Sequence, residues 1–260
     1  MLDVSIIIVS FNARSHLDRC LQSLHFAPPK RAHETIVVDN ASTDGSAESA
    51  RRWASVRVID AGSNLGFAAA NNIGIRASSG RNLLLLNSDT IVPPGAVDKL
   101  LALLEVDPSV AVVGPRLVDA RGRPELSFGG MVSPWNEFRQ KALRPWRTES
   151  LTSRQRLPDW VSGACLLVRR TDAEAVGLLD ERYFMYFEDV DFCAAIRTRG
   201  GLILFTPSVQ VTHLRGRSRA SALRATKRAY RRSQLAFYEK HHPDLVPLLR
   251  VYLRVRLADM

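Results

Sequence analysis

The sequence has few cysteines and no long apolar run. Its three cysteines, Cys20, Cys165 and Cys193, form no CxxC pair and leave one thiol unpaired under any disulfide scheme, which favours a reducing cytoplasm. No stretch approaches the roughly 18 uninterrupted apolar residues that a membrane-spanning helix needs. The first residues, MLDVSIIIVSFN, carry an acid where a signal peptide carries bases, so they predict a buried strand and a cytoplasmic protein.

Glycine-rich phosphate loops are also absent. No GxGxxG follows the first apolar run and no GxxxxGK[ST] occurs anywhere, which disfavours dinucleotide-binding and P-loop enzymes. The chain has 260 residues, of which 46% are apolar and 24% charged, enough for one large α/β domain.

The net charge of +10 is concentrated at one end of the chain. Residues 213–260 hold twelve Lys or Arg and three acids, so +9 of the total lies there and the remainder is nearly neutral. This distribution argues against a surface coated for nucleic acid and for a basic tail on an ordinary globule. The predicted organisation is a domain over 1–217 and a helical basic tail over 218–260.

Apolar runs alternate with amphipathic stretches in the first half of the domain. The expected strands there are Val4–Val9, Thr35–Val38, Val56–Ile59 and Asn82–Leu86. Alternating strands and helices predict an α/β fold with a mainly parallel sheet covered by helices on both faces.

The second half is less regular. Residues 119–158 have no clear period, so we expect a long excursion over the active-site face. The expected elements around it are helices at Ala13–His25, Gly95–Glu105 and Glu188–Thr198 and strands at Val110–Val113, Cys165–Val168 and Leu202–Phe205.

Polar clusters follow the four expected strands of the first half. They are Ser10-Phe11-Asn12, Asp39-Asn40, Asn64-Leu65-Gly66-Phe67 and Asn87-Ser88-Asp89. Ligands of open parallel sheets bind at the carboxyl ends of the strands, so these clusters are expected to converge in one crevice.

Seven strings resemble the bacterial family 2 glycosyltransferases, especially the rhamnosyltransferase-like branch. In order they are VSIIIVSFN, ETIVVDNASTDGS, NLGFAAANNIGI, LLLLNSDT, WVSGACLLVRR, DERYFMYFEDVDFC and VTHLRGRS. The resemblance covers nearly all of 4–218. It implies a GT-A, Rossmann-like catalytic domain whose nucleotide-sugar-binding half is 1–118 and whose acceptor-binding and catalytic half is 119–217. The implied reaction is inverting transfer from a dTDP- or UDP-linked sugar, with L-rhamnose from dTDP-rhamnose as the favoured donor.

The resemblance assigns nucleotide-sugar binding to residues spread along the chain. They are Ser10, Phe11, Asn12, Asp39, Asn40, Asn64, Gly66, Asn72, Asn87, Ser88 and Arg217. A carboxylate such as Asp39 accepts from N–H and hydroxyl groups together, as a base or ribose requires, and its alternative is a turn-forming role. For Asn64 and Asn72 the alternative is local packing. Asp44 is assigned to turn and cap duty.

The metal motif of the family falls at Asn87-Ser88-Asp89. The resemblance implies a divalent cation, Mg²⁺ or Mn²⁺, held by Asp89 and by His213, and such ions take few protein carboxylates when phosphates complete the shell. Asparagine at 87 replaces the motif's first acid, so metal affinity without nucleotide is expected to be low. The alternatives are a simple turn at Asp89 and a hydrogen-bonded structural histidine at 213.

Catalysis is assigned to the segment Glu188-Asp189, which opens a predicted helix. The resemblance makes Asp189 the general base for the acceptor hydroxyl, and a helix N-terminus helps to keep it ionised. Without that resemblance, Glu188 and Asp189 read as acids that complement the helix dipole. Trp160, Gly163 and Ala164 are expected to meet the acceptor, with aromatic packing as the alternative for Trp160.

The tail combines cations with later apolar residues. The cations of its first part are Arg224, Lys227, Arg228, Arg231 and Arg232, and the chain ends LVPLLRVYLRVRLADM. Basic amphipathic segments adsorb to anionic lipid, so the tail is expected either to contact the inner membrane face or to form a solvated helix. His241 and His242 are expected to face solvent.

The acceptor implied is a saccharide or a polyprenyl-diphosphate-linked glycan of the cell envelope, with no nucleic acid bound. Two other functions stay open at this point. A sugar-phosphate nucleotidyltransferase would need a glycine-rich loop after the first strand, which VSFNARSHL lacks. A basic nucleic-acid-binding protein would show strongly salt-dependent binding.

Overall fold

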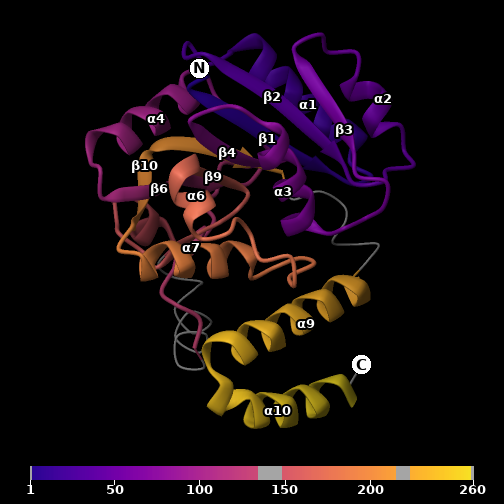
Figure 1. Cartoon of the computed structure of the whole chain (residues 1–260), viewed down its shortest axis with the longest axis vertical. Helices are drawn as coiled ribbons and strands as arrows, with labels where there is room; N and C mark the ends of the chain where they lie inside the picture. Colours follow the sequence, from indigo (N-terminus) through magenta and orange to yellow (C-terminus); the bar gives the residue numbers. More distant parts are fainter. Residues whose placement is uncertain (1, 134–147, 215–222, 259–260) are drawn as a thin grey trace.

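An eight-stranded sheet forms the centre of the structure, with the strand order β3-β2-β1-β4-β9-β6-β10-β5 (Figure 1). The structure is a computed structural model that describes residues 2–133, 148–214 and 223–258. The strands of the sheet are β1 Val4–Ser10, β2 His33–Asp39, β3 Val56–Asp60, β4 Asn82–Asn87, β5 Thr90–Ile91, β6 Val110–Val118, β9 Cys165–Arg169 and β10 Leu202–His213. The helices are α1 Arg14–Phe26, α2 Ser46–Ala50, α3 Phe67–Ala77, α4 Ala96–Val106, α6 Arg170–Ala175, α7 Glu188–Thr198, α9 Leu223–His241 and α10 Val246–Ala258.

The first four strands pair in parallel, as the alternation of apolar runs and helices predicts. β1 lies between β2 and β4, and the register places Ser10 opposite Asp39 and Val9 opposite Asn87. All three strands therefore end at the same level of the sheet, and the polar residues that follow them emerge together.

The second half departs from the parallel pattern at two strands. β9 runs antiparallel between β4 and β6, and β5 runs antiparallel to the end of β10. The strand expected to end at Phe205 continues through an irregular stretch to His213, which pairs with Thr90. That pairing brings His213 beside the loop that follows β4.

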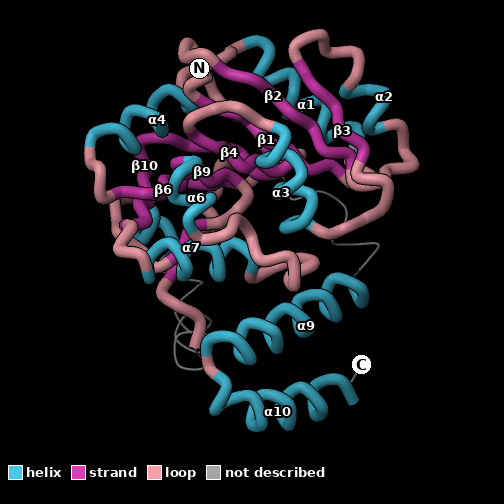
Figure 2. The backbone as a smooth tube through the Cα atoms, in the orientation of Figure 1, coloured by secondary structure: helices cyan, strands magenta, loops and turns pink. Residues whose placement is uncertain are grey.

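Helices cover both faces of the sheet (Figure 2). Side chains alternate across a strand, so Ile6 and Ile8 of β1 pack with α1 and α4 on one face. Ile7 packs with α3 and α7 on the other face. Both faces are buried, which explains the continuous Val, Ile and Leu runs of the sequence.

The region 119–158 contains little regular structure where it is described. It holds the strand β7 (Phe128–Gly129), which pairs with β8 (Trp160–Val161) outside the main sheet. Residues 134–147 lie outside the described part.

The basic tail forms two helices, α9 and α10, joined by the 3-10 turn Pro243–Leu245. They lie at the end of the molecule opposite the N-terminus (Figure 1). Within the described residues, no helix combines the length and the apolarity that crossing a membrane requires.

The tail packs on the domain more closely than the sequence suggests. Phe237 and Tyr238 of α9 are buried against the segment 183–190. The prediction that His241 and His242 face solvent is wrong. The His241 ring lies 2.6 Å from Asp191, and the His242 ring lies 2.9 Å from the Val132 carbonyl oxygen. Both rings reach the domain because α9 packs on it through the apolar face that carries Phe237 and Tyr238.

Candidate functional site

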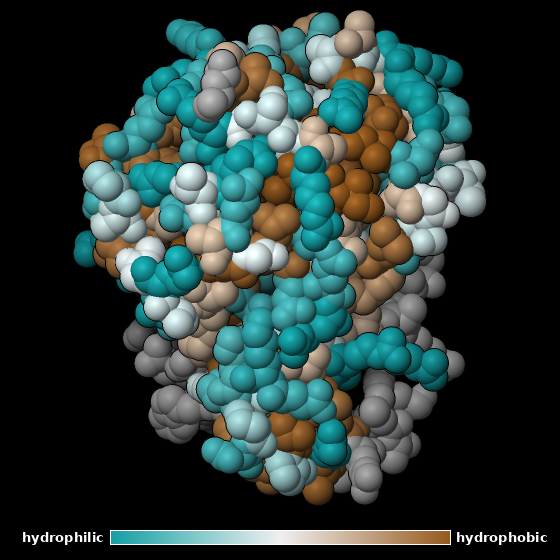
Figure 3. Space-filling view, in the orientation of Figure 1, coloured by the Kyte–Doolittle hydropathy of each residue, from teal (hydrophilic) through white to brown (hydrophobic). Residues whose placement is uncertain are grey.

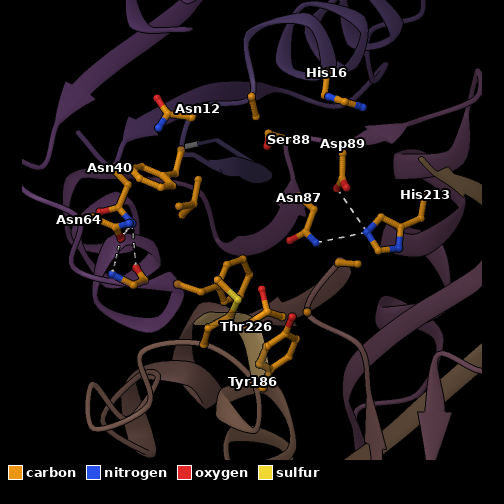
Figure 4. Close-up of a pocket in the computed structure, with 18 of the residues that line it drawn as sticks. Asn12, His16, Asn40, Asn64, Asn87, Ser88, Asp89, Tyr186, His213 and Thr226 are labelled. Atoms are coloured by element: carbon orange, nitrogen blue, oxygen red, sulfur yellow. Dashed lines mark hydrogen bonds and ion pairs between the residues drawn. The ribbon is translucent and has the colours of Figure 1, made fainter. Parts of the chain in front are cut away.

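A cleft of about 800 Å³ opens where β1, β2 and β4 end (Figure 4). The loops after these strands line it, together with the first turns of α1 and α7. Each of the four predicted polar clusters contributes at least one residue, so their expected convergence in one crevice is confirmed. The predicted site residues that line the cleft are Phe11, Asn12, Asn40, Asn64, Gly66, Asn87, Ser88, Asp89, Gly163, Ala164, Glu188, Asp189 and His213.

The loop after β1 is tied to the loop after β2. The Asn12 side-chain oxygen accepts the Thr43 N–H at 2.8 Å, and Asp44 accepts the Arg14 N–H at 2.9 Å. Asp44 also accepts the Ser46 N–H, which agrees with its expected role in turns and helix starts. Phe11 stays 45% exposed in the cleft, where a flat apolar face is available to a ligand ring.

Ser10 and Asp39 lie beneath the cleft instead of lining it. Both are buried, Ser10 at 0% and Asp39 at 4% exposure. One Asp39 oxygen accepts the Ser42 N–H at 3.0 Å, while the other, and the Ser10 hydroxyl, have no hydrogen-bond partner. A buried acceptor without a partner costs free energy unless a ligand donates to it. The structure does not bring Ser10 to the cleft surface.

Asn40 and Asn64 hold the loop before α3 in shape. The Asn40 amide donates to the Asn64 side-chain oxygen at 3.0 Å and to the Gly66 carbonyl oxygen, and Asn40 accepts the Leu65 N–H. Asn64 thus has a clear local packing role. Gly66 adopts φ +85°, and a Cβ there would lie 2.2 Å from the Phe184 carbonyl oxygen. Only glycine permits this approach of the two backbones.

Asn87, Asp89 and His213 meet at one side of the cleft (Figure 4). The His213 Nε2 atom lies 3.3 Å from an Asp89 oxygen and 3.5 Å from the Asn87 amide nitrogen. On its other side, the His213 Nδ1 atom lies 3.2 Å from Glu125. The Glu125 side chain is only 9% exposed.

The charge on His213 follows from these neighbours. Burial disfavours the imidazolium, but the hydrogen bonds and charges of Asp89 and Glu125 outweigh burial and raise the pKa of His213 to about 9. At neutral pH His213 therefore carries a proton between two carboxylates. A cation that bound Nε2 would replace that proton, and the contact of Nδ1 with Glu125 would keep the ring in place.

These donors fit a divalent cation whose shell is completed by phosphate. The Asp89 carboxylate and the His213 imidazole point to one place, and Asn87 would add its amide oxygen by turning its NH₂ group away from His213. Mn²⁺ accepts such a donor set. Among the described residues, no three His, Cys, Asp or Glu side chains form a cluster that encloses an ion by themselves. The residues therefore agree with the expectation of weak metal affinity without nucleotide.

Glu188 and Asp189 line the same cleft from the start of α7. Both Asp189 oxygens accept backbone N–H groups, one from Gly163 and one from Val190, each at 2.9 Å. One Glu188 oxygen is buried without a hydrogen-bond partner. Asp191, two residues on, points away from the cleft toward α9.

The two acids differ in their affinity for a proton. Burial raises the pKa of Asp189, and its two backbone hydrogen bonds partly oppose that rise. Burial and the neighbouring Asp189 charge raise the pKa of Glu188 well above its usual value. Both acids therefore bind a proton more tightly than exposed carboxyl groups do, and the neighbouring charge raises the pKa of Glu188 further.

Three other predicted site residues do not line the cleft in the described part of the structure. Asn72 is turned away from the cleft, because its amide donates to Leu179 and Glu181 and thereby fastens α3 to the chain before α7. The Trp160 ring does not line the cleft, and its N–H donates to Gly130. Arg217 lies outside the described residues.

Other residues of the site were missed from the sequence. Glu125, which contacts His213 without lining the cleft, lies in the irregular excursion, where no pattern marks it. Met185 and Tyr186 stand in the aromatic cluster before α7, and Thr226 comes from α9, which was predicted to be a separate tail. The charge asymmetry of the tail gave no sign that α9 reaches the cleft.

The chain matches the family model described as Glycosyl transferase family 2 over residues 5–176. It is 33% identical over 267 residues to an N-acetylglucosaminyl-diphospho-decaprenol L-rhamnosyltransferase of Mycobacterium tuberculosis strain H37Rv, covering 93% of this chain and 86% of that protein. It is 27% identical to the low-salt glycan biosynthesis hexosyltransferase Agl10 of Haloferax volcanii, covering 75% of this chain and 62% of that protein.

Two solved structures share the fold. The mannosyltransferase PcManGT of Pyrobaculum calidifontis, in complex with GDP-Man and Mn²⁺, superposes with a TM-score of 0.64 at 20% identity, covering 96% of this chain and 70% of that one. GalNAc-T7 with UDP, GalNAc and Mn²⁺ also gives 0.64 at 20% identity, covering 82% of this chain and 44% of that one.

The raised pKa of Glu188 predicts that Glu188→Gln stabilises the protein at neutral pH. The unfolded chain loses this proton near pH 4.5 and the folded chain only at the higher value, so the wild type loses stability as pH rises between the two. The gain in thermal unfolding midpoint over wild type should be small at pH 4.5 and grow toward pH 8. A gain that is constant with pH would contradict the assignment.

Proposed function

The chain belongs to glycosyl transferase family 2, and from that premise we propose that it transfers a sugar with inversion from a nucleoside diphosphate to a lipid-linked saccharide. The protein is a glycosyltransferase, and its α/β fold is of the GT-A type.

The observation that carries the proposal is that two acidic sites line one cleft. Asp89 and His213 enter it from the ends of β4 and β10, and Asp189 enters it from the start of α7. The polar groups after β1 and β2 line the same cleft, and a nucleobase and ribose would bind to them. A bound nucleotide sugar would then have its diphosphate near Asp89 and its sugar between Asp89 and Asp189.

Asp189 acts as the general base. Its two backbone hydrogen bonds fix the carboxylate, and its raised pKa makes it a better proton acceptor than an ordinary aspartate. As the acceptor oxygen bonds to the anomeric carbon, Asp189 takes the hydroxyl proton. The bond from that carbon to the diphosphate breaks on the opposite face, and the electron pair leaves with the nucleoside diphosphate.

Asp89, His213 and Asn87 would hold a divalent cation, Mg²⁺ or Mn²⁺, with the diphosphate completing its shell. Such a cation supplies positive charge that stabilises the leaving diphosphate. Glu125 accepts from His213 Nδ1 and so orients the ring toward Asp89.

The substrates are proposed from the relatives. The mycobacterial relative is named as an L-rhamnosyltransferase of N-acetylglucosaminyl-diphospho-decaprenol, which supports dTDP-L-rhamnose as donor and a polyprenyl-diphosphate-linked saccharide as acceptor. The resulting glycan would enter envelope polysaccharide synthesis. Asp39 would accept a hydrogen bond from the nucleotide only if the loop that covers its buried, unpartnered oxygen moved aside.

The outer face of α10 would contact the inner face of the membrane. Leu248, Val251 and Tyr252 recur with helical spacing and are 67%, 60% and 39% exposed. The Arg231 guanidinium lies 5.7 Å from the centre of the Tyr252 ring, so a cation borders this apolar stripe. Figure 3 shows apolar surface at this end of the molecule among hydrophilic side chains. Such a surface suits anionic lipid.

Asp189→Asn is expected to lower kcat by about 10²- to 10⁴-fold, because the general base is lost. Asparagine leaves one of the two N–H groups without an acceptor, but it also removes the buried charge, so the two effects on stability oppose each other. The rate of sugar transfer from dTDP-rhamnose is measured for each variant, and calorimetry measures its affinity for the donor. Asp60→Asn, an exposed acid outside the cleft, is the control. Full turnover in Asp189→Asn would refute the proposed base.

His213→Ala and Asp89→Ala should each abolish stabilisation by Mn²⁺ together with dTDP. A ligand that binds only the folded state raises the unfolding midpoint, and the wild type should respond more to metal and nucleotide together than to either alone. His25→Ala, which changes an exposed histidine outside the cleft, is the control. Unchanged stabilisation in both cleft variants would place the cation elsewhere.

The membrane proposal predicts cosedimentation with vesicles of equal phosphatidylglycerol and phosphatidylcholine, and weaker binding to phosphatidylcholine alone, because basic residues favour anionic lipid. The double variant Leu248→Ser with Tyr252→Ser should lose most of this binding. Val106→Ser, which changes an 81% exposed valine at the end of α4, is the matched control. Equal binding by the double variant and the control would contradict this surface.

A further inference from the structure

The segment before the catalytic acids has an unusual backbone. Tyr186 and Phe187 are consecutive residues with φ values of 71° and 70°, in the left-handed region that bulky side chains rarely adopt. Such a turn persists only where its surroundings hold it. Phe187 is also the residue that caps α7, and the Asp191 N–H donates to its carbonyl oxygen at 2.8 Å.

Helix α9 supplies most of what holds this turn. The Tyr230 ring contacts both strained residues, with ring centres 5.6 Å from Tyr186 and 5.2 Å from Phe187. The Ser233 hydroxyl donates to the Met185 carbonyl oxygen at 2.8 Å, and Ser233 is only 2% exposed. These contacts fix the backbone immediately before Glu188.

The far end of α9 is attached to α7 itself. Asp191, whose side chain is 3% exposed, accepts from Lys240 at 2.8 Å and lies 2.6 Å from the His241 ring. The Tyr183 hydroxyl donates to the same carboxylate at 3.3 Å. A buried carboxylate with these partners holds the register of α9 along α7.

The turn also borders the loop assigned to the nucleotide. The Phe184 carbonyl oxygen accepts the Phe67 N–H at 2.7 Å, beside Gly66. Met185 and Tyr186 line the cleft, and so does Thr226 from the first turn of α9. The turn therefore lies between the nucleotide-binding side and α9, with Asp189 at its end.

We propose that α9 is part of the active site: its Tyr230 and Ser233 are positioning residues that hold the 185–187 turn and thereby the Asp189 carboxylate. This inference rests on the proposed function of Asp189. The tail is thus a working part of the catalytic domain as well as a surface for lipid.

The test compares Tyr230→Ala, Tyr230→Phe and Ser233→Ala in the full-length chain. Tyr230→Ala removes both ring contacts and is expected to lower kcat by about 10- to 100-fold, since small misplacements of catalytic groups have such effects. Donor affinity, measured by calorimetry with dTDP-rhamnose, should stay unchanged. Tyr230→Phe keeps the ring and should recover kcat to within about threefold of wild type.

The control is Glu239→Gln, which changes an exposed residue of α9 that pairs with Arg250 on the surface. Wild-type kcat in a folded Tyr230→Ala protein would overturn the inference, and so would failure of Tyr230→Phe to recover. If Tyr230→Ala does not fold, Ser233→Ala decides. A lower kcat at unchanged donor affinity supports the inference, and an unchanged kcat overturns it.

Asp189→Asn, measured in parallel, separates the two proposals. If Asp189→Asn keeps full turnover, the proposed function itself fails. If Asp189→Asn loses turnover while Tyr230→Ala and Ser233→Ala do not, the base stands and only the role of α9 is wrong.

Discussion

The hydrogen bond from the Gly163 N–H to Asp189 is the contact on which the geometry of the cleft depends. Gly163 lies in the loop that enters β9, and the next residue, Ala164, accepts the Asn87 N–H at 3.0 Å. These two contacts link the loop after β4, which carries Asp89, to the start of α7. A Cβ at 163 would lie 3.2 Å from the Phe67 ring and 3.4 Å from the Asp189 Cβ, so a larger residue would fit tightly against both. The antiparallel insertion of β9 beside β4 therefore sets the position of Asp189 relative to Asp89.

Holding Glu188 and Asp189 in this place lowers the free energy of unfolding in two ways. Glu188 and Asp189 are adjacent acids with raised pKa values, and Tyr186 and Phe187 before them adopt left-handed backbone that costs about 1–3 kcal/mol each. Residues under such strain are common at functional sites, where the surroundings hold them. Here the surroundings include α9, and this gives a physical reason for the tail to pack on α7.

Much of the fold could be predicted from the sequence because its signals are local. Buried parallel strands read as continuous Val, Ile and Leu runs, and the expected strand at Val4–Val9 and helix at Glu188–Thr198 match the structure closely. The convergence of the polar clusters followed from the rule for parallel sheets. The antiparallel direction of β9 could not be predicted, because a short apolar run does not show whether its strand runs parallel or antiparallel to its neighbours.

The site was predicted less completely because long-range contacts decide it. Asn72 sits in the same string as Asn64, yet its face of α3 turns toward Leu179 instead of the cleft. Glu125 has no pattern around it and is brought to His213 only by the pairing of β10 with β6. The tail was expected either to contact the membrane or to form a solvated helix, because charge dominates its composition. Its buried contacts depend on partners far away in the sequence, such as Asp191.

A crystal structure with dTDP and Mn²⁺ bound is the most direct test of the proposed function. The expected structure has the metal between the diphosphate and Asp89. Its thymine lies over the loops after β1 and β2, and its terminal phosphate faces Asp189. A nucleotide bound outside this cleft, or a diphosphate that points away from Asp189, would contradict it.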